Sequence, residues 1–239
     1  MKVYMVYSGT YHQQLIESGC RIVVSYGLKT SLPAGFHDYL IDSGGYQSKN
    51  GTAKRLLLVE RYANWLMDIL TEYGNKISGY ISLDIKNAEE SFKNYQYLRS
   101  LGLSPIPVWK ADSPVKHLDY YADKSQIIAI GGVNSKGSIS NQALFRFVTN
   151  RHLDNLYHML GIGTGITSFK VFPYSIDCSS WLNPAKFGHQ ILFDEKEIVR
   201  DVVMPNSLQE RIKNNRELEK ELVKIAIRNL MKLEDVTRA

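Results

Sequence analysis

Short runs of apolar and β-branched residues recur along the whole chain, and the intervals between several of them are long enough to hold a helix. Most of these runs are continuous rather than alternating, which is typical of strands that are covered on both faces. We therefore predict eight strands, at residues 3–7, 22–25, 39–41, 79–83, 106–108, 127–130, 157–161 and 175–176.

Apolar residues at helical spacing predict helices in three of the intervals, at residues 55–73, 88–101 and 141–150. Eight strand-to-helix steps in one chain predict an α/β fold, a (β/α)8 TIM barrel. The 239 residues are few for this fold, so several helices must be short, and residues 8–21 are expected to hold one of them. We expect one domain over residues 1–239.

The last part of the chain, residues 206–239, is predicted to be a helical extension of the barrel, with a long helix over residues 207–234. Its apolar stripe consists of Leu208, Ile212, Leu218, Leu222, Ile225 and Leu230. We interpret it as a helix that packs on the outside of the barrel. A role in dimerisation or in nucleic-acid docking is the alternative.

The amino-acid composition is that of a globular protein without a disulfide framework. A hydrophobic content of 44% and a charged content of 22% are ordinary for a globular protein, and the formal net charge of +5 favours an anionic partner such as nucleic acid. Cys20 and Cys178 are the two cysteines, so a disulfide framework is excluded and a structural zinc site is not expected. No apolar run has the length of a membrane span or a signal peptide, so we expect a cytoplasmic protein without a membrane partner.

Carboxylates follow three of the predicted strands. Asp42 begins the segment DSGGYQ, Asp84 ends SLD, and Asp177 follows the last strand. In a barrel, functional groups lie where the strands end and the following loops begin. One such aspartate can be a helix cap, but three like charges in one cleft repel each other, which favours a catalytic or ligand-binding role for the set.

Three aspartates without cysteine or histidine ligands are compatible with three kinds of chemistry. They are the binding of a hard metal such as magnesium, glycosyl transfer with a nucleophile and an acid/base, and recognition of the N–H groups on a base edge. Glycine pairs after strands six and seven, at 131–132 and at Gly161 and Gly163, favour the last two. They make room for a flat ligand and offer it backbone N–H and C=O groups.

Five motifs occur in one order along residues 38–181: DSGGYQ at 42–47, SLD at 82–84, IGGV at 130–133, LGIGT at 160–164 and IDC at 176–178. This set resembles the tRNA-guanine transglycosylase superfamily, whose members are (β/α)8 barrels that exchange a guanine base for a 7-deazaguanine. DSGGYQ is the most specific of the motifs, and SLD is the least.

The resemblance implies a role for each matching residue. Asp177 would be the nucleophile, which attacks C1′ of the target nucleoside, expels guanine and forms a covalent glycosyl–enzyme intermediate. Asp42 would be the acid/base, which helps guanine to leave and then takes a proton from the incoming base. Asp84 would accept hydrogen bonds from N1–H and the 2-amino group of the purine. Neither a metal nor a cofactor is implied.

Further residues near these aspartates are implied to bind the base. Tyr46 and Leu160 would sandwich it, Gln47 would help to hold it, and the backbones of Gly132 and Val133 would face its 7-substituent. Trp181 either stacks on a flanking base or belongs to the core. The remaining substrate-binding candidates are Ser43, Gly44, Lys110, Gly131 and Gly161.

The sequence departs from the tRNA enzymes at three places. The family's zinc subdomain, with its CxCxxC segment, is absent, Trp109 or Lys110 stands where the family has a glutamine, and the nucleophile is followed by the run CSSW. These departures resemble the DNA-modifying branch, found in phages and bacterial genomic islands, which inserts 7-deazaguanines such as preQ0 into DNA. We therefore expect DNA and a free guanine or 7-deazaguanine base as partners, with tRNA as the alternative polymer. For a phage protein, the location would be the host cytoplasm.

A target guanine in a duplex would have to be flipped out to reach an aspartate in the barrel mouth, and basic residues would have to hold the phosphates. The lysines of the predicted loops are candidates: Lys29, Lys86, Lys110, Lys116, Lys136 and Lys170. Other hypotheses remain open at this point, namely a non-catalytic binding subunit, a barrel glycoside hydrolase and a magnesium-dependent lyase. A homodimer or an accessory protein is compatible with each of them.

Overall fold

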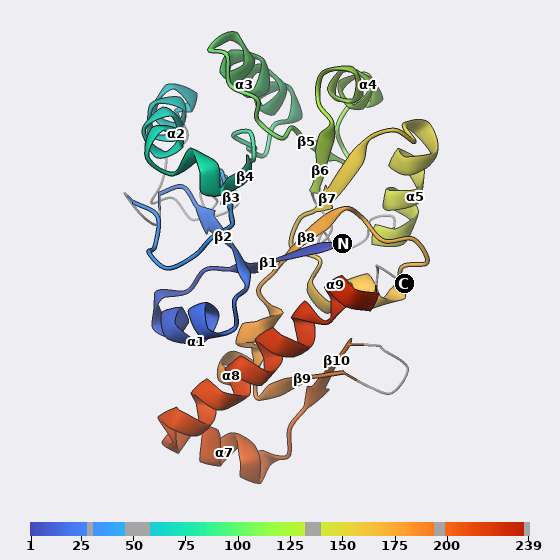
Figure 1. Cartoon of the computed structure of the whole chain (residues 1–239). Helices are drawn as coiled ribbons and strands as arrows, with labels where there is room; N and C mark the ends of the chain where they lie inside the picture. The colour runs from blue at the N-terminus through green and yellow to red at the C-terminus, as the bar shows by residue number, and fades with distance from the viewer. Residues whose placement is uncertain (28–30, 46–57, 132–139, 194–198, 237–239) are drawn as a thin grey trace. The chain divides into compact units, whose positions relative to one another are not determined.

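The computed structural model describes residues 1–27, 31–45, 58–131, 140–193 and 199–236. Eight strands alternate with helices along the chain (Figure 1). Their bounds are Lys2–Val6 (β1), Arg21–Ser25 (β2), Tyr39–Asp42 (β3), Ile77–Tyr80 (β4), Val108–Lys110 (β5), Ile127–Gly131 (β6), Leu156–Met159 (β7) and Ser175–Cys178 (β8). All eight predicted strands are present, with ends that differ by a few residues.

The strands form a parallel sheet in the order β4-β3-β2-β1-β8-β7-β6-β5. An isolated parallel bridge between Ile81 and Ile106 joins the two strands at the ends of this order. Two backbone hydrogen bonds support the bridge, from Ser82 N to the Ile106 carbonyl and from Ile106 N to the Tyr80 carbonyl, at 2.8 and 2.7 Å. The fold is the predicted (β/α)8 barrel, with a helical C-terminal extension.

The chain separates into two compact units. The first consists of Met1–Ile22 and Gly161–Ala239, and the second of Val23–Leu160. One boundary falls inside β2 and the other directly after Leu160, so the expectation of one domain stays a prediction. We describe each unit by itself.

The second unit contains the run of strands from β3 to β7 and four helices that lie around them (Figure 1). The helices are Val59–Tyr73 (α2), Ala88–Ser100 (α3), Val115–Lys124 (α4) and Asn141–Arg151 (α5). The strands bury most of their apolar side chains, as expected of parallel strands covered by helices, with the exception of β4, where Ile77 and Tyr80 are partly exposed. Asn87 caps α3 by accepting hydrogen bonds from the amides of Glu89 and Glu90, which fixes where that helix begins.

The first unit contains the parallel pair β1–β8, in which Tyr4 lies opposite Asp177. It also contains η1 (Gly9–Tyr11), α1 (His12–Glu17), η5 (Gly163–Ser168), η6 (Ser180–Leu182) and α6 (Asn183–Phe187). An antiparallel hairpin of β9 (His189–Phe193) and β10 (Val199–Val203) follows, which the apolar runs did not predict. Figure 1 shows this hairpin beside the C-terminal helices.

The prediction of one helix over residues 207–234 is wrong in one respect, because the segment is divided into Asn206–Asn214 (α7), Arg216–Met231 (α8) and Leu233–Val236 (α9). Asn215 interrupts it with an extended backbone, and its side chain accepts a hydrogen bond from Leu218 N at 3.1 Å. An asparagine that caps the following helix offers the backbone an alternative to continuing the preceding one.

The predicted apolar stripe is buried only in part: Ile212 and Leu230 are buried, Leu208, Leu218 and Leu222 are partly exposed, and Ile225 is 40% exposed. The face of α8 that packs within the first unit shares only Leu230 with that stripe. Val223, Ala226, Ile227 and Leu230 are at helical spacing and are fully buried. Beyond it, the buried Glu234 accepts a hydrogen bond from Val3 N at 2.8 Å and pairs with Arg21 at 2.7 Å, which ties α9 to β1 and β2 within this unit. Within the described ranges, no helix is long and apolar enough to cross a membrane.

Candidate functional site

Asp42 is the last residue of β3, at the carboxyl end of the strand as predicted. Its Oδ2 accepts a hydrogen bond from Ser25 Oγ at 2.8 Å, and its carbonyl accepts one from Tyr26 N at 2.8 Å. Ser25 is the last residue of β2, so the ends of two neighbouring strands orient this carboxylate together. Sequence reasoning missed Ser25, although a small polar residue at the end of a buried strand was a signal for it.

The two glycines after Asp42 are required by close approaches of the backbone. Gly44 has a φ of +71°, and a Cβ there would lie 2.6 Å from the Tyr26 carbonyl oxygen. A Cβ on Gly45 would lie 1.6 Å from the carbonyl oxygen of Asp84. Both positions therefore exclude a side chain. The glycines bring the loop after β3 directly against the loop that carries Asp84.

Asp84 lies three residues beyond the bridge that joins β4 to β5, and its carboxylate is held by two side chains. Lys110 Nζ donates to Oδ1 at 2.8 Å, and Ser91 Oγ donates to the same oxygen at 3.1 Å. Its backbone amide is 3.3 Å from Ser43 Oγ. Ser91, in the first turn of α3, is a second residue that sequence reasoning missed, because its contact depends on how the loop after β4 folds.

Burial raises the pKa of the Asp84 carboxyl above its ordinary value, and the charge of Lys110 and the hydrogen bonds from Lys110 and Ser91 offset part of that rise. The ammonium therefore favours the ionised form of Asp84, which is the form that accepts hydrogen bonds. Lys110 also donates to the carbonyl of Ile85 at 2.6 Å. The Lys110 ammonium is thus directed at Asp84 and Ile85, and not at the surface, where a phosphate contact would need it.

Gly131 lies beside the Lys110 side chain on one hand and beside Leu160 on the other. Gly131 ends β6, and a Cβ on it would lie 3.0 Å from Val108 Cγ1, 3.2 Å from Lys110 Cγ and 3.6 Å from Leu160 Cδ1. Leu160 follows β7 and donates its amide to the Ile130 carbonyl at 3.0 Å. The second unit therefore brings together predicted residues that follow or end five of its strands, β3 to β7.

Asp177 belongs to the first unit, where it lies on β8. Its Oδ1 accepts a hydrogen bond from Gly161 N at 2.9 Å. The loop after β7 also meets the loop after β8, because Gly163, at a φ of +53°, would place a Cβ 2.4 Å from Ser180 Oγ. The backbone of the predicted LGIGT motif thus orients the carboxylate of the predicted nucleophile.

Cys178 and Trp181, which follow Asp177 in the sequence, are both buried. Trp181 has no exposed surface and packs edge-on against Tyr11, with 5.7 Å between the ring centroids. In this structure it is therefore a core residue, the second of the two interpretations given above. Its indole nitrogen has no hydrogen-bond partner among the described residues. Burial raises the pKa of the Cys178 thiol to about 11, which keeps it protonated and unreactive.

Several predicted residues lie outside the described ones, namely Tyr46, Gln47, Gly132, Val133, Lys29 and Lys136. Among the described candidates for phosphate contacts, Lys86, Lys116 and Lys170 are exposed. The described residues contain no group of three histidine, cysteine, aspartate or glutamate side chains that could hold a metal ion.

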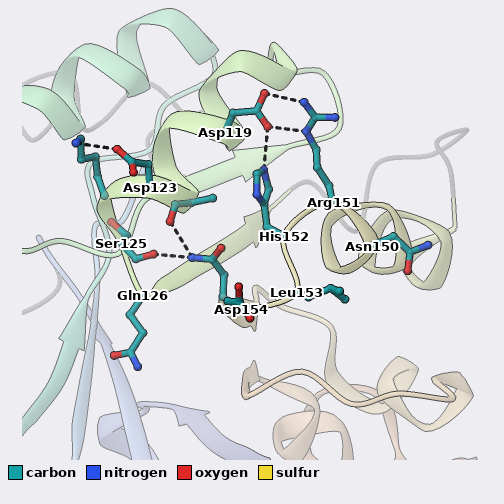
Figure 2. A pocket seen from close by; sticks show the side chains of 12 residues that line it. Asp119, Asp123, Ser125, Gln126, Asn150, Arg151, His152, Leu153 and Asp154 are labelled. Carbon is teal, nitrogen blue, oxygen red and sulfur yellow. Dashed lines mark hydrogen bonds and ion pairs between the residues drawn. The ribbon is translucent and has the colours of Figure 1, made fainter.

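A hollow of about 790 Å³ lies elsewhere in the second unit (Figure 2). It is lined by the end of α4, the end of α5 and the residues that lead into β6 and β7, so it lies at the amino ends of these strands. Figure 2 shows Arg151 and His152 directed at Asp119, which they contact at 2.5 and 2.8 Å. No predicted site residue lines this hollow. Barrels carry their chemistry at the opposite, carboxyl ends, so we place the candidate site there.

Comparisons with known proteins leave the function open. No protein-family model matches the sequence, and no curated protein is significantly similar to it. One solved structure from Aquifex aeolicus VF5 is similar, at 10% sequence identity and a TM-score of 0.48, over 96% of this chain and 94% of that chain. At that level the likeness carries no argument about function.

Proposed function

We propose that this protein is a base-exchange transglycosylase that replaces guanine in DNA with a 7-deazaguanine. The observation that carries the proposal is the Asp84 cluster, a largely buried carboxylate fixed at the carboxyl ends of β4 and β5 by Lys110 and Ser91. An oriented acceptor of this kind suits the N1–H and 2-amino donors of a guanine edge. The resemblance of the five ordered motifs to guanine transglycosylases supports it.

The proposal gives Asp177 the role of the nucleophile, since barrels carry their catalytic groups at the carboxyl ends of the strands. Asp177 attacks C1′ of the target nucleotide, and the bond between C1′ and N9 breaks with its electron pair going to the guanine. Gly161 N fixes one oxygen of Asp177 and so sets the direction of the carboxylate. The result is a covalent glycosyl ester.

Asp42 manages the proton in both halves of the exchange. It donates a proton to the departing guanine, and as a carboxylate it then takes the N9 proton of the incoming base, whose nitrogen attacks C1′ and releases Asp177. The two displacements retain the configuration at C1′, as in retaining glycosidases. Ser25 Oγ orients the carboxylate for this role.

DNA is the proposed polymer for reasons of sequence and charge. The cysteine set of the zinc subdomain that supports tRNA binding is absent, and the net charge of +5 suits a polyanion. The target nucleotide must leave the duplex, at a cost of a few kcal/mol. Exposed Lys86, Lys116 and Lys170 are available for phosphate contacts. The reaction would take place in the cytoplasm.

Incorporation of a labelled base tests the proposal. Purified protein is incubated with radiolabelled guanine or preQ0 and, separately, with duplex DNA, single-stranded DNA and bulk tRNA. We expect label in DNA with the wild-type protein, none above background with Asp177→Ala, and normal labelling with Asp154→Ala, an exposed aspartate outside the site. Label in tRNA alone would support the exchange reaction and contradict the assignment of DNA as the substrate. Release of free guanine without incorporation would indicate a hydrolase.

A further inference from the structure

Lys110 is a part-buried cation at the position where the candidate site would meet the edge of a base. The exposed fractions of the Lys110 and Asp84 side chains are 13% and 24%. An ammonium has three N–H groups, and its described partners, Asp84 Oδ1 and the Ile85 carbonyl, take two of them. One N–H thus remains for a ligand beside the carboxylate.

The surroundings hold this cation in place. Gly131 leaves room for the aliphatic stem, since a Cβ there would lie 3.2 Å from Lys110 Cγ. Gly45 lets the loop after β3 lie directly against the backbone of Asp84, which fixes the other member of the pair. Both partners are fixed before a ligand arrives. The pair therefore presents a hydrogen-bond donor, the Lys110 ammonium, next to hydrogen-bond acceptors, the oxygens of the Asp84 carboxylate.

That arrangement matches a guanine edge, which carries an acceptor oxygen at position 6 followed by the N1–H and 2-amino donors. We propose that Lys110 donates to the 6-oxo oxygen and thereby sets the charge of the base that the site accepts, excluding bases with a cationic 7-substituent. Lys110 is then a specificity-determining residue. This inference rests on the proposed function, since it takes Asp84 to be the group that reads the base.

The physical reason is the position of the 7-substituent. In a 7-deazaguanine, carbon 7 and the 6-oxo group project from the same side of the fused rings, so a group bound to the oxygen lies beside the substituent. A 7-aminomethyl group would bring a second ammonium next to that of Lys110, at a part-buried position where solvent screens charges less than it does at the surface. A neutral nitrile is not repelled, and a carboxylate is attracted. A neutral glutamine at this position would not rank the bases by the charge of the 7-substituent.

Equilibrium binding of three free bases tests the inference without any polymer. The bases are 7-carboxy-, 7-cyano- and 7-aminomethyl-7-deazaguanine, and their dissociation constants are measured by calorimetry. We expect the wild-type protein to bind the carboxy and cyano bases at least tenfold more tightly than the aminomethyl base. Equal binding, tighter binding of the aminomethyl base, or binding of none of the three would overturn the inference.

Substitutions then assign the preference to Lys110. Lys110→Gln keeps a donor and loses the charge, so we expect it to reduce the ratio between the cyano and aminomethyl bases at least fivefold. Lys110→Arg keeps the charge and should keep the ratio, and so should Lys93→Gln, the matched change at an exposed lysine of α3. An unchanged ratio in Lys110→Gln would overturn the inference.

The two proposals fail in different ways. If the protein prefers bases by the charge of the 7-substituent but incorporates no base into DNA or tRNA, the role of Lys110 stands and the proposed exchange reaction is overturned. Incorporation that depends on Asp177, with no preference among the three bases, would leave the reaction and overturn the role of Lys110.

Discussion

At the scale of single residues, the structure gives a physical reason for the pair of glycines in DSGGYQ. Gly44 and Gly45 meet the backbones of two different segments, at Tyr26 and at Asp84, more closely than any side chain allows. The two predicted site aspartates of the second unit are in turn oriented by small hydroxyl residues, Ser25 for Asp42 and Ser91 for Asp84. The positions of the carboxylates therefore depend on residues with no acid–base role of their own.

Gly45→Ala tests this dependence. A Cβ at 1.6 Å from the Asp84 carbonyl oxygen forces the backbone to move, so we expect a loss of roughly 3 kcal/mol in the free energy of unfolding, at the upper end for overpacking. For a chain of this size, that corresponds to a fall in Tm of about 6–12 °C. Differential scanning calorimetry measures the shift.

Gly74→Ala is the matched control, because a Cβ on Gly74 meets no atom within 4 Å and its φ of −50° suits alanine. We expect it to leave Tm unchanged or to raise it slightly, since alanine has less freedom to lose on folding. Equal Tm values for the two variants would contradict the account of the glycine pair.

At the scale of elements, the strands were predictable and the C-terminal helices were only partly so. Parallel strands covered on both faces leave continuous apolar runs, which is why all eight were found from the sequence. The stripe that predicted one helix over residues 207–234 continues across Asn215, so periodicity alone could not show the break. The β9–β10 hairpin was missed because polar residues interrupt it, among them His189, Arg200 and Asp201.

Asn215→Ala tests the role of this residue as a cap. Its side chain accepts the Leu218 amide in the first turn of α8, and we expect its loss to cost about 1 kcal/mol. Tm should fall by about 2–4 °C in a thermal unfolding experiment. Asn214→Ala, one residue earlier at the end of α7, removes the same side chain without a described capping bond and should change Tm much less. Equal effects would show that the cap does not matter.

At the scale of the whole molecule, the alternation of strands and helices explains why motifs far apart in the chain each lie at or near the carboxyl end of a strand. The sequence was enough to predict an aspartate at the end of β3 and one next to the end of β8, because an aspartate directly follows a buried run in each case. It could not predict that Lys110 pairs with Asp84 or that Gly161 N holds Asp177, since these contacts depend on how separate loops approach each other. Lys110 consequently changes from a candidate phosphate contact to a partner of the proposed base reader.

The most direct test of the proposed chemistry is to trap the intermediate. The protein is mixed with labelled guanine-containing DNA, denatured and resolved on a denaturing gel, and the adduct is mapped by mass spectrometry. We predict a protein–DNA adduct on the peptide that contains Asp177, absent in Asp177→Asn, present in Asp154→Asn and reversed by excess free guanine. Base exchange without an adduct, or an adduct on another residue, would contradict the assignment of Asp177 as the nucleophile.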